Sequence, residues 1–187
     1  KNATDQSLLT HATTKAALNF IREQGRKKEP FFAYLPYAAV HLPRVGHPDF
    51  LPAGAPTSKA NKTGVELTVH LKAQVEELDA AVGQVFSALK EQGVENNTIV
   101  LFMSDNGGSR GTSMGPLKGG KGSLYEGGPR TPFLIHWPGF IPAGKVSHEI
   151  GVSSDLLPTL AKLCGGKLSG NKMDCLLYTS DAADEVR

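Results

Sequence analysis

One short segment of this chain, Thr98 to Met103, constrains the fold more than any other. It is apolar and rich in β-branched residues, and Ser104-Asp105-Asn106-Gly107-Gly108 follows it directly. Such a run predicts a buried strand, because strands covered on both faces are continuously apolar in sequence. Ligands of open α/β sheets collect at the carboxyl edge of the strands, so the polar turn is a candidate for a site.

The turn offers two hard oxygen donors. Asp105 would present a carboxylate and Asn106 an amide oxygen, which are the ligands that Ca²⁺ and Mg²⁺ prefer. Gly107 and Gly108 would let the backbone turn away sharply. A plain Asp-Asn-Gly turn without any ligand is the alternative, and these residues alone do not exclude it.

A glycine-rich run, Gly119 to Arg130, follows the turn and places Lys121 between glycines. Glycines allow close approach of a ligand, so the ammonium suits an anionic group such as phosphate or sulfate. The spacing fits neither the phosphate loop of nucleotide-binding proteins nor the dinucleotide fingerprint. The alternative is a flexible glycine loop with a solvated lysine. Taken together, the two motifs suggest hydrolysis of an anionic ester.

Helices and strands alternate along the rest of the chain, which implies a mostly parallel sheet covered by helices on both faces. Some strands of that sheet would normally pair with residues that precede this chain, so they are expected at an open edge. The predicted elements, besides the strand at 98–103, are a helix from Leu8 to Gln24 that stops at Gly25, a strand from Phe31 to Leu35, a long irregular loop from Tyr37 to Asn61 with His41 near its start, a helix from Val69 to Gln92 that ends at Gly93, a strand from Thr131 to Trp137, and a helix from Ser153 to Leu163 capped by Ser154 or Asp155 with Pro158 in its first turns.

Six motifs in order make the chain similar to the second half of the catalytic domain of type I, formylglycine-dependent sulfatases. The resemblance runs from about Thr4 to Gly166. The matching stretches are Pro30 to Tyr37 leading to His41-Leu42-Pro43, Glu77 to Gly83, Asn97 to Val100 into Ser104-Asp105-Asn106-Gly107, Pro116 through Gly128, Trp137-Pro138-Gly139 with Ala143-Gly144, and Asp155 to Leu160.

The resemblance implies roles for four residues. Asp105 and Asn106 match the family's later pair of Ca²⁺ ligands, with Mg²⁺ as a possible substitute, while Lys121 and His41 match residues that hold the sulfate and its ester oxygen. Without the resemblance, His41 would be a loop histidine ahead of Pro43. Chemistry agrees with the implied roles, because a fixed ammonium and a divalent ion stabilise developing negative charge and a histidine can donate a proton to the leaving group. The implied architecture is part of an alkaline-phosphatase-like α/β sandwich with a mostly parallel sheet flanked by helices.

The family's nucleophile is absent from this sequence. It is a formylglycine made from the Cys or Ser of a Cys/Ser-x-Pro-x-Arg motif, and in the family it lies upstream of the matched region. Neither Cys164 nor Cys175 is followed by Pro and Arg at those offsets. We therefore expect residues 1–174 to be the C-terminal portion of a sulfatase catalytic domain, an internal fragment that is inactive by itself. Residues 175–187 break the family pattern and are interpreted as a non-native tail.

The composition restricts the possible classes of binding partner but identifies none of them. The formal net charge is +2 with the charges well mixed, which gives no case for nucleic acid, and no apolar stretch approaches the length of a membrane span. The resemblance implies a sulfated small molecule or glycan as substrate and a periplasmic, secreted or lysosomal location. Two alternatives stay open: a metal-dependent phosphatase or phosphodiesterase of the same superfamily, and a non-catalytic homologue that binds sulfated glycans.

Overall fold

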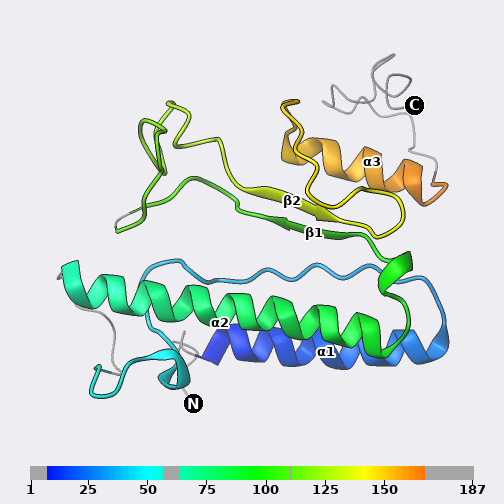
Figure 1. The fold of residues 1–187 in the computed structure, drawn as a ribbon, viewed down its shortest axis with the longest axis horizontal. Coiled ribbons are helices and arrows are strands. Elements are labelled where there is room, and N and C mark those ends of the chain that lie inside the picture. The colour runs from blue at the N-terminus through cyan, green and yellow to red at the C-terminus, as the bar shows by residue number, and fades with distance from the viewer. Residues whose placement is uncertain (1–7, 57–63, 110, 167–187) are drawn as a thin grey trace. The chain divides into compact units, whose positions relative to one another are not determined.

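The computed structural model describes residues 8–56, 64–109 and 111–166 of the chain. Clustering of contacts divides the chain into two compact units, Lys1–Ala143 and Gly144–Arg187. The first unit holds two long helices, a two-stranded sheet and the loops that carry the candidate site (Figure 1). The second unit holds one short helix.

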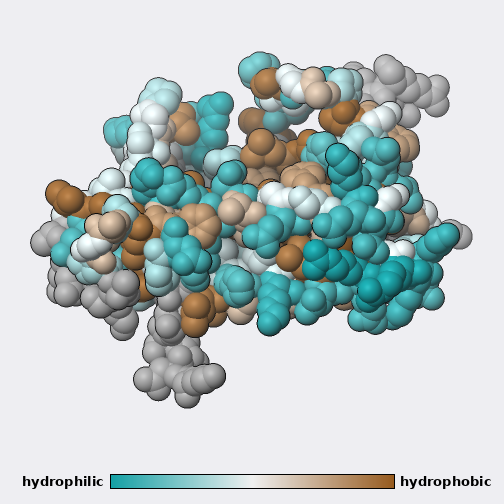
Figure 2. Space-filling model, turned by 60° about the horizontal axis from the view of Figure 1, so that its bottom comes forward, coloured by the Kyte–Doolittle hydropathy of each residue, from teal (hydrophilic) through white to brown (hydrophobic). Residues whose placement is uncertain are grey.

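Two helices, α1 (Leu9–Lys27) and α2 (Gly64–Glu91), pack side by side and form the main core (Figure 1). The buried cluster between them consists of Ile21, Val85, Ala88 and Leu89, with Leu18, Phe31, Leu35, Val94 and Val100 packed against it. In Figure 2 hydrophilic side chains cover much of the visible surface, and hydrophobic residues lie among them in patches. Each helix of this parallel pair therefore follows the amphipathic pattern that predicted it.

Both helices extend beyond their predicted ends. The prediction that α1 stops at Gly25 is wrong, because the helix continues to Lys27 and Lys28 takes the left-handed conformation with φ of 55°. Gly25 is buried within the helix, where an added Cβ would lie 2.6 Å from the Cβ of Gln92. Its lack of a side chain thus serves packing rather than helix termination. Helix α2 begins at Gly64, before the predicted Val69, and ends at Glu91, one residue before the predicted Gln92.

The sheet consists of β1 (Val100–Met103) and β2 (Phe133–His136), which lie within the two strands predicted at 98–103 and 131–137. They pair in antiparallel fashion with Val100 opposite His136 and Met103 opposite Phe133. Within the described residues this sheet differs from the mostly parallel one that was predicted. The loops at 104–132 turn the chain straight back beside β1, whereas a parallel neighbour requires a crossover connection.

Two further expectations about strands fail within this chain. No strand forms at 31–35, because the backbone there has no neighbouring strand in the described residues to pair with. The strands at the sheet are also less buried than predicted: all four residues of β2 are exposed, as are Phe102 and Met103 of β1. The apolar sequence predicts covering layers that residues 8–56, 64–109 and 111–166 do not supply.

The predicted long loop is irregular over 37–56 apart from the 3₁₀ turn η2 (Pro48–Phe50), and its remaining residues, 57–61, lie outside the described part. A second 3₁₀ turn, η3 (Glu95–Asn97), connects α2 to β1. The first connection, between α1 and α2, carries His41, and the second leads through β1 to the Asp105 turn.

The second unit contains η4 (Ser153–Asp155) and α3 (Leu156–Leu163), which together cover the predicted helix at 153–163. The Asp155 carboxylate accepts a hydrogen bond from the Val152 N–H at 2.8 Å and so stabilises the start of η4. Asp155 acts as the third residue of that turn and makes no side-chain capping hydrogen bond to α3, so it is not the helix cap that was predicted. Pro158 is buried in the first turn of α3. The predicted tail at 175–187, its Cys175 and the boundary at 174 all lie outside the described residues.

Candidate active site

The turn after β1 presents the two predicted oxygen donors. At its start the Ser104 N–H donates to the Pro132 carbonyl at 3.3 Å, and the Ser104 hydroxyl donates to the Asn106 carbonyl at 3.0 Å. Asp105 is exposed and Asn106 is half-buried. The backbone of the turn is therefore fixed by hydrogen bonds while the Asp105 carboxylate stays open to a ligand.

Two backbone hydrogen bonds join this turn to the glycine-rich loop. The Gly107 N–H donates to the Gly128 carbonyl at 2.7 Å, and the Lys121 N–H donates to the Gly108 carbonyl at 2.9 Å. The two motifs, recognised separately in the sequence, are thus brought together in space. One loop pair, made of residues 104–108 and 118–128, carries both oxygen donors and the lysine.

Glycine is required where the two loops meet. A Cβ on Gly107 would lie 1.8 Å from the Gly127 carbonyl oxygen, and a Cβ on Gly128 would lie 2.0 Å from the Ser123 carbonyl oxygen. Non-bonded carbon and oxygen atoms cannot approach so closely, so no other residue fits this backbone. The glycine content of both motifs is therefore a condition for joining them, and not only a source of flexibility.

Lys121 and a second lysine occupy different settings in the loop pair. Lys121 is exposed, so its ammonium is not desolvated by this chain. Lys118 places its Nζ 3.8 Å from the centre of the Tyr125 ring, in a cation–π arrangement, and its carbonyl accepts from the Gly127 N–H at 2.8 Å. Lys118 is thus engaged within the loop, whereas Lys121 is free to meet an anion.

His41 lies in the other loop and has a defined ring orientation. Its side chain is exposed, and Nδ1 lies 2.6 Å from the Leu42 carbonyl oxygen. A carbonyl only accepts, so Nδ1 carries a proton and Nε2 is the atom that faces outward for chemistry. Within the part of the chain that the structure describes, no hydrogen bond joins His41 to the loop pair.

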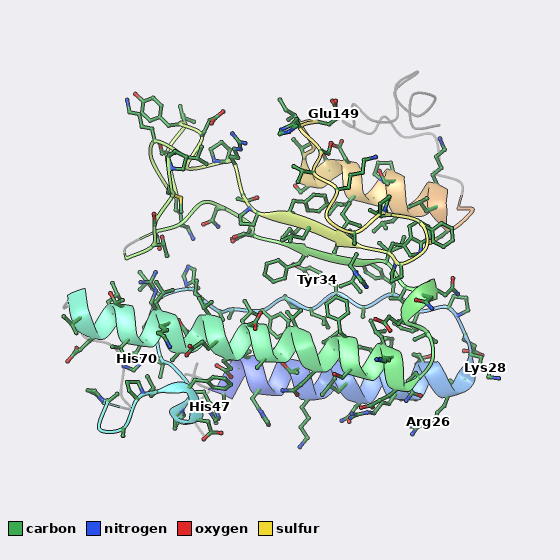
Figure 3. The ribbon with its side chains drawn as sticks, in the orientation of Figure 1. Arg26, Lys28, Tyr34, His47, His70 and Glu149 are labelled. Carbon is green, nitrogen blue, oxygen red and sulfur yellow. The ribbon has the colours of Figure 1, made fainter. Side chains whose placement is uncertain are left out.

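The residues after His41 anchor its loop to α2. Arg44, Val45 and Gly46 are buried, and the Gly46 N–H donates at 2.9 Å to Nδ1 of His70. His70, labelled on α2 in Figure 3, is itself only 1% exposed. The histidine loop is therefore anchored to α2 at Gly46, five residues after His41.

Arg44 is a residue that the sequence reasoning missed. It is 1% exposed, and its Nη1 would lie 3.1 Å from a Cβ built on Gly111, which follows the Asp105 turn. Neither Nε nor Nη1 has a hydrogen-bond partner in the described residues, and burial lowers the pKa of the guanidinium. Arg44 thus connects the His41 loop with the chain beyond Asp105. Nothing in the local pattern of a proline-flanked loop predicted a buried arginine there.

The donor set fits part of a divalent-cation site. Ca²⁺ takes six to eight oxygen ligands, and Asp105 with Asn106 provides two oxygen-bearing side chains of the right chemistry on a fixed turn. Across residues 8–56, 64–109 and 111–166, no group of three or more His, Cys, Asp or Glu residues is arranged to hold a metal ion. Any ion bound here needs further ligands from elsewhere in the protein.

Comparison with known proteins gives the family. A family model described as Sulfatase matches residues 2–166. The chain belongs to the sulfatase family. It is 37% identical to mouse N-acetylgalactosamine-6-sulfatase over 170 residues and 39% identical to human arylsulfatase A over 163 residues, which are 88% and 84% of this chain.

Solved structures agree with this sulfatase assignment. The crystal structure of Ps i-CgsB has a TM-score of 0.77 and 41% identity and covers 89% of this chain, and its complex with k-i-k-neocarrahexaose has a TM-score of 0.74 and 42% identity over 86%. This chain covers 36% and 35% of those chains and 30% of both curated sulfatases. It therefore has an alkaline-phosphatase-like α/β fold and spans about a third of its relatives' length. Its described helices include none long and apolar enough to cross a membrane.

Proposed function

We propose that this chain supplies part of the active site of an enzyme that hydrolyses sulfate esters. The observation that carries the proposal is the pair of hydrogen bonds from Gly107 to Gly128 and from Lys121 to Gly108, in a chain of the sulfatase family. They place a carboxylate, an amide oxygen and a free ammonium on one rigid loop pair. Such a group suits an anionic ester whose charge shifts toward the leaving oxygen during cleavage.

Lys121 is the proposed partner of the sulfuryl oxygens. Its backbone is fixed by Gly108 and its side chain is exposed, so the ammonium can meet a bound sulfate without rearrangement of the loop. The substrate is anionic before the reaction and its charge is redistributed in the transition state. A preorganised cation therefore favours turnover more than simple binding.

His41 is the proposed proton donor to the leaving oxygen. Because the Leu42 carbonyl holds a proton on Nδ1, Nε2 can donate only when the ring carries its second proton. The geometry thus favours a donor that acts through Nε2 and is recharged from solvent, to which the side chain is exposed.

Asp105 and Asn106 are the proposed ligands of Ca²⁺, or of Mg²⁺ in its place. When bound, the ion would neutralise charge on the sulfate group. The remaining ligands and the formylglycine nucleophile would come from polypeptide outside this chain. By itself the 187-residue chain should therefore hydrolyse no sulfate ester, and two ligand side chains should bind Ca²⁺ only weakly.

The proposed substrate class is a sulfated glycan. This rests on the names of relatives, which include N-acetylgalactosamine-6-sulfatase, and on a structural neighbour solved with k-i-k-neocarrahexaose. A location outside the cytoplasm is part of the same proposal. Phosphate ester hydrolysis within the same superfamily, or glycan binding without turnover, are the outcomes that would replace it.

The test uses the intact protein and matched sulfate and phosphate esters. We expect clear preference for the sulfate, and a Lys121→Ala variant with kcat lowered by about 10²–10³ and KM changed less. Lys118→Ala is the matched control, because Lys118 lies in the same loop but faces the Tyr125 ring, and it should retain kcat within about tenfold. Preference for the phosphate ester, or equal losses in the two variants, would contradict the proposal.

A further inference from the structure

The loop that carries His41 is attached to the helix pair at two points. On its upstream side the Tyr37 hydroxyl lies 3.1 Å from the Thr14 hydroxyl on α1. On its downstream side the Gly46 N–H donates at 2.9 Å to Nδ1 of His70, which is labelled on α2 in Figure 3. One attachment lies on each side of His41, so together they hold the stretch of backbone from which its ring extends.

The attachment at His70 is the more deeply buried of the two. His70 is 1% exposed and Gly46 is buried, whereas Tyr37 is half-buried. A Cβ built on Gly46 would lie 2.6 Å from the Cβ of Ala73, so the loop backbone lies directly against α2 at this point. A buried N–H without an acceptor is costly. If His70 lost its acceptor, the loop would therefore have to leave the helix or admit water there.

The hydrogen bond also defines the state of the His70 ring. A ring nitrogen that accepts from an N–H carries no proton, so the single proton of the neutral ring lies on Nε2. Among the described residues Nε2 has no hydrogen-bond partner, although it is buried. An apolar residue would fill this position at less cost, because buried polar groups normally have partners. The bond from Gly46 is thus the contact that accounts for a histidine at this point of α2.

The same attachment holds Arg44 in place. Arg44 precedes Gly46 by two residues and is 1% exposed, and its Nη1 would lie 3.1 Å from a Cβ built on Gly111. Its guanidinium thus reaches the segment that follows the Asp105 turn. A loop released at Gly46 would shift this contact as well, so the attachment affects both the His41 side and the Asp105 side of the candidate site.

We propose that His70 is a positioning residue for sulfate ester hydrolysis. Its Nδ1 holds the loop of His41 against α2 and thereby sets where Nε2 of His41 meets the leaving oxygen. Because His70 is buried, it acts through Gly46 and does not touch the substrate. The inference rests on the proposed role of His41 as the proton donor. A catalytic group displaced by about 1 Å can cost about 10²-fold in rate, so the effect should fall on kcat more than on KM.

Two amide substitutions in the intact protein separate the acceptor from the rest of the ring. In His70→Asn the side-chain oxygen takes about the position of Nδ1, whereas in His70→Gln it lies one bond further out, near the position of Nε2. With an aryl sulfate as substrate, we expect His70→Gln to lower kcat by about 10–10²-fold with KM changed less. His70→Asn should keep kcat within about fivefold of the wild type, because its oxygen can accept from the Gly46 N–H.

Leu89→Ala is the matched control for loss of stability. Leu89 is a buried residue near the other end of α2, and it belongs to the cluster that packs against α1. This variant weakens the helix core without removing the attachment of the loop, so it should keep the wild-type kcat at a temperature where it stays folded. Equal losses of kcat in Leu89→Ala and His70→Gln would assign the effect to stability and overturn the inference.

Hydrogen exchange measures the position of the loop without any use of activity. In the intact protein, the peptide spanning residues 38–46 contains the amides of His41 and Gly46, which donate to the Ala38 carbonyl and to His70. We expect these amides to exchange about tenfold faster or more in His70→Gln, and at about the wild-type rate in His70→Asn. Wild-type exchange in His70→Gln would overturn the inference, and so would faster exchange with an unchanged kcat.

The wild-type ring provides a measurement that survives if His70→Gln does not fold. Nitrogen-15 NMR of the histidine-labelled chain should show Nδ1 without a proton and Nε2 with one, in a signal that is absent from His70→Asn. A proton on Nδ1 would overturn the inference. A wild-type protein that hydrolyses no sulfate ester would instead refute the proposed function, and hydrogen exchange over 38–46 would still decide whether His70 holds the loop.

Discussion

In the pair formed by α1 and α2, buried side chains hold the structure together, whereas backbone hydrogen bonds hold the loop pair around Lys121. Leu89 and Ala88 belong to the buried cluster of the helix pair and are 2% and 0% exposed. In the loop pair, Asp105, Lys121 and Tyr125 are exposed, and buried glycines bring the two backbones together. The comparison teaches that this chain combines a buried helical core with a candidate site whose backbone is held in place while its side chains stay exposed.

The largest effect that we expect comes from a substitution in the core between α1 and α2. Leu89→Ala should lower the free energy of unfolding by about 2–5 kcal/mol, because it removes a fully buried side chain and leaves a cavity. Leu124→Ala, in the glycine-rich loop and 102% exposed, should change it by less than about 0.5 kcal/mol. Urea unfolding of the isolated chain measures both. Similar losses in the two variants would mean that the loop region shares the core.

A glycine substitution tests the loop pair. Gly107→Ala would force a Cβ against the Gly127 carbonyl oxygen at 1.8 Å, so the loops must separate. In the intact protein we expect sulfatase turnover to fall by about 10²-fold or more, because Asp105 and Lys121 would lose their common frame. Helical circular dichroism of the isolated chain should stay near the wild-type value. Full turnover in the variant would refute the requirement for glycine.

The matching glycine substitution in the helix pair should stabilise the fold and not disrupt it. Gly83 lies in α2, and a Cβ added there meets nothing within 4 Å. Gly83→Ala should therefore raise the free energy of unfolding by about 0.5–1 kcal/mol, since alanine restricts the unfolded chain and favours helix. Thermal unfolding of the isolated chain provides the measurement. A destabilised variant would show that Gly83 has a packing role in this chain.

The smallest effect that we expect is on the pH dependence of stability, through the buried Glu77 of α2. Burial raises the pKa of the Glu77 carboxyl above its usual value of 4.5, and the nearby His47 partly opposes the shift. Because the folded pKa is raised, the stability that Glu77 contributes is present below pH 4.5 and is lost as the pH rises through the raised pKa.

Glu77→Gln should therefore lose less stability than the wild type between pH 4.5 and neutral pH. Glu76→Gln is the control, since Glu76 is the exposed neighbour of Glu77 on the same helix. This variant should keep the wild-type pH profile. Urea unfolding at several pH values measures the difference. Parallel profiles for wild type and Glu77→Gln would show that burial does not perturb this carboxyl.

Local pattern was enough to locate most elements of the first unit. The apolar face of 69–92 and the β-branched run before Asp105 predicted α2 and β1, because helix and strand periodicity depends on near neighbours in sequence. The same reasoning failed at Gly25, where a contact with Gln92 from a distant part of the chain makes glycine useful inside a helix. It also failed at 31–35, where a strand requires a partner that the described residues do not include.

The sequence by itself indicated which residues are candidates for the chemistry and where most of the helices and strands lie, because side-chain identity and local periodicity are properties of short segments. Only the tertiary structure decided that Gly107 meets Gly128 and that Lys121 bonds to Gly108. It alone showed that Arg44 of the histidine loop is buried and that β1 and β2 are antiparallel. Each of these facts depends on atoms far apart in the chain, whose approach is set by packing and backbone pairing and leaves no periodic trace in the sequence.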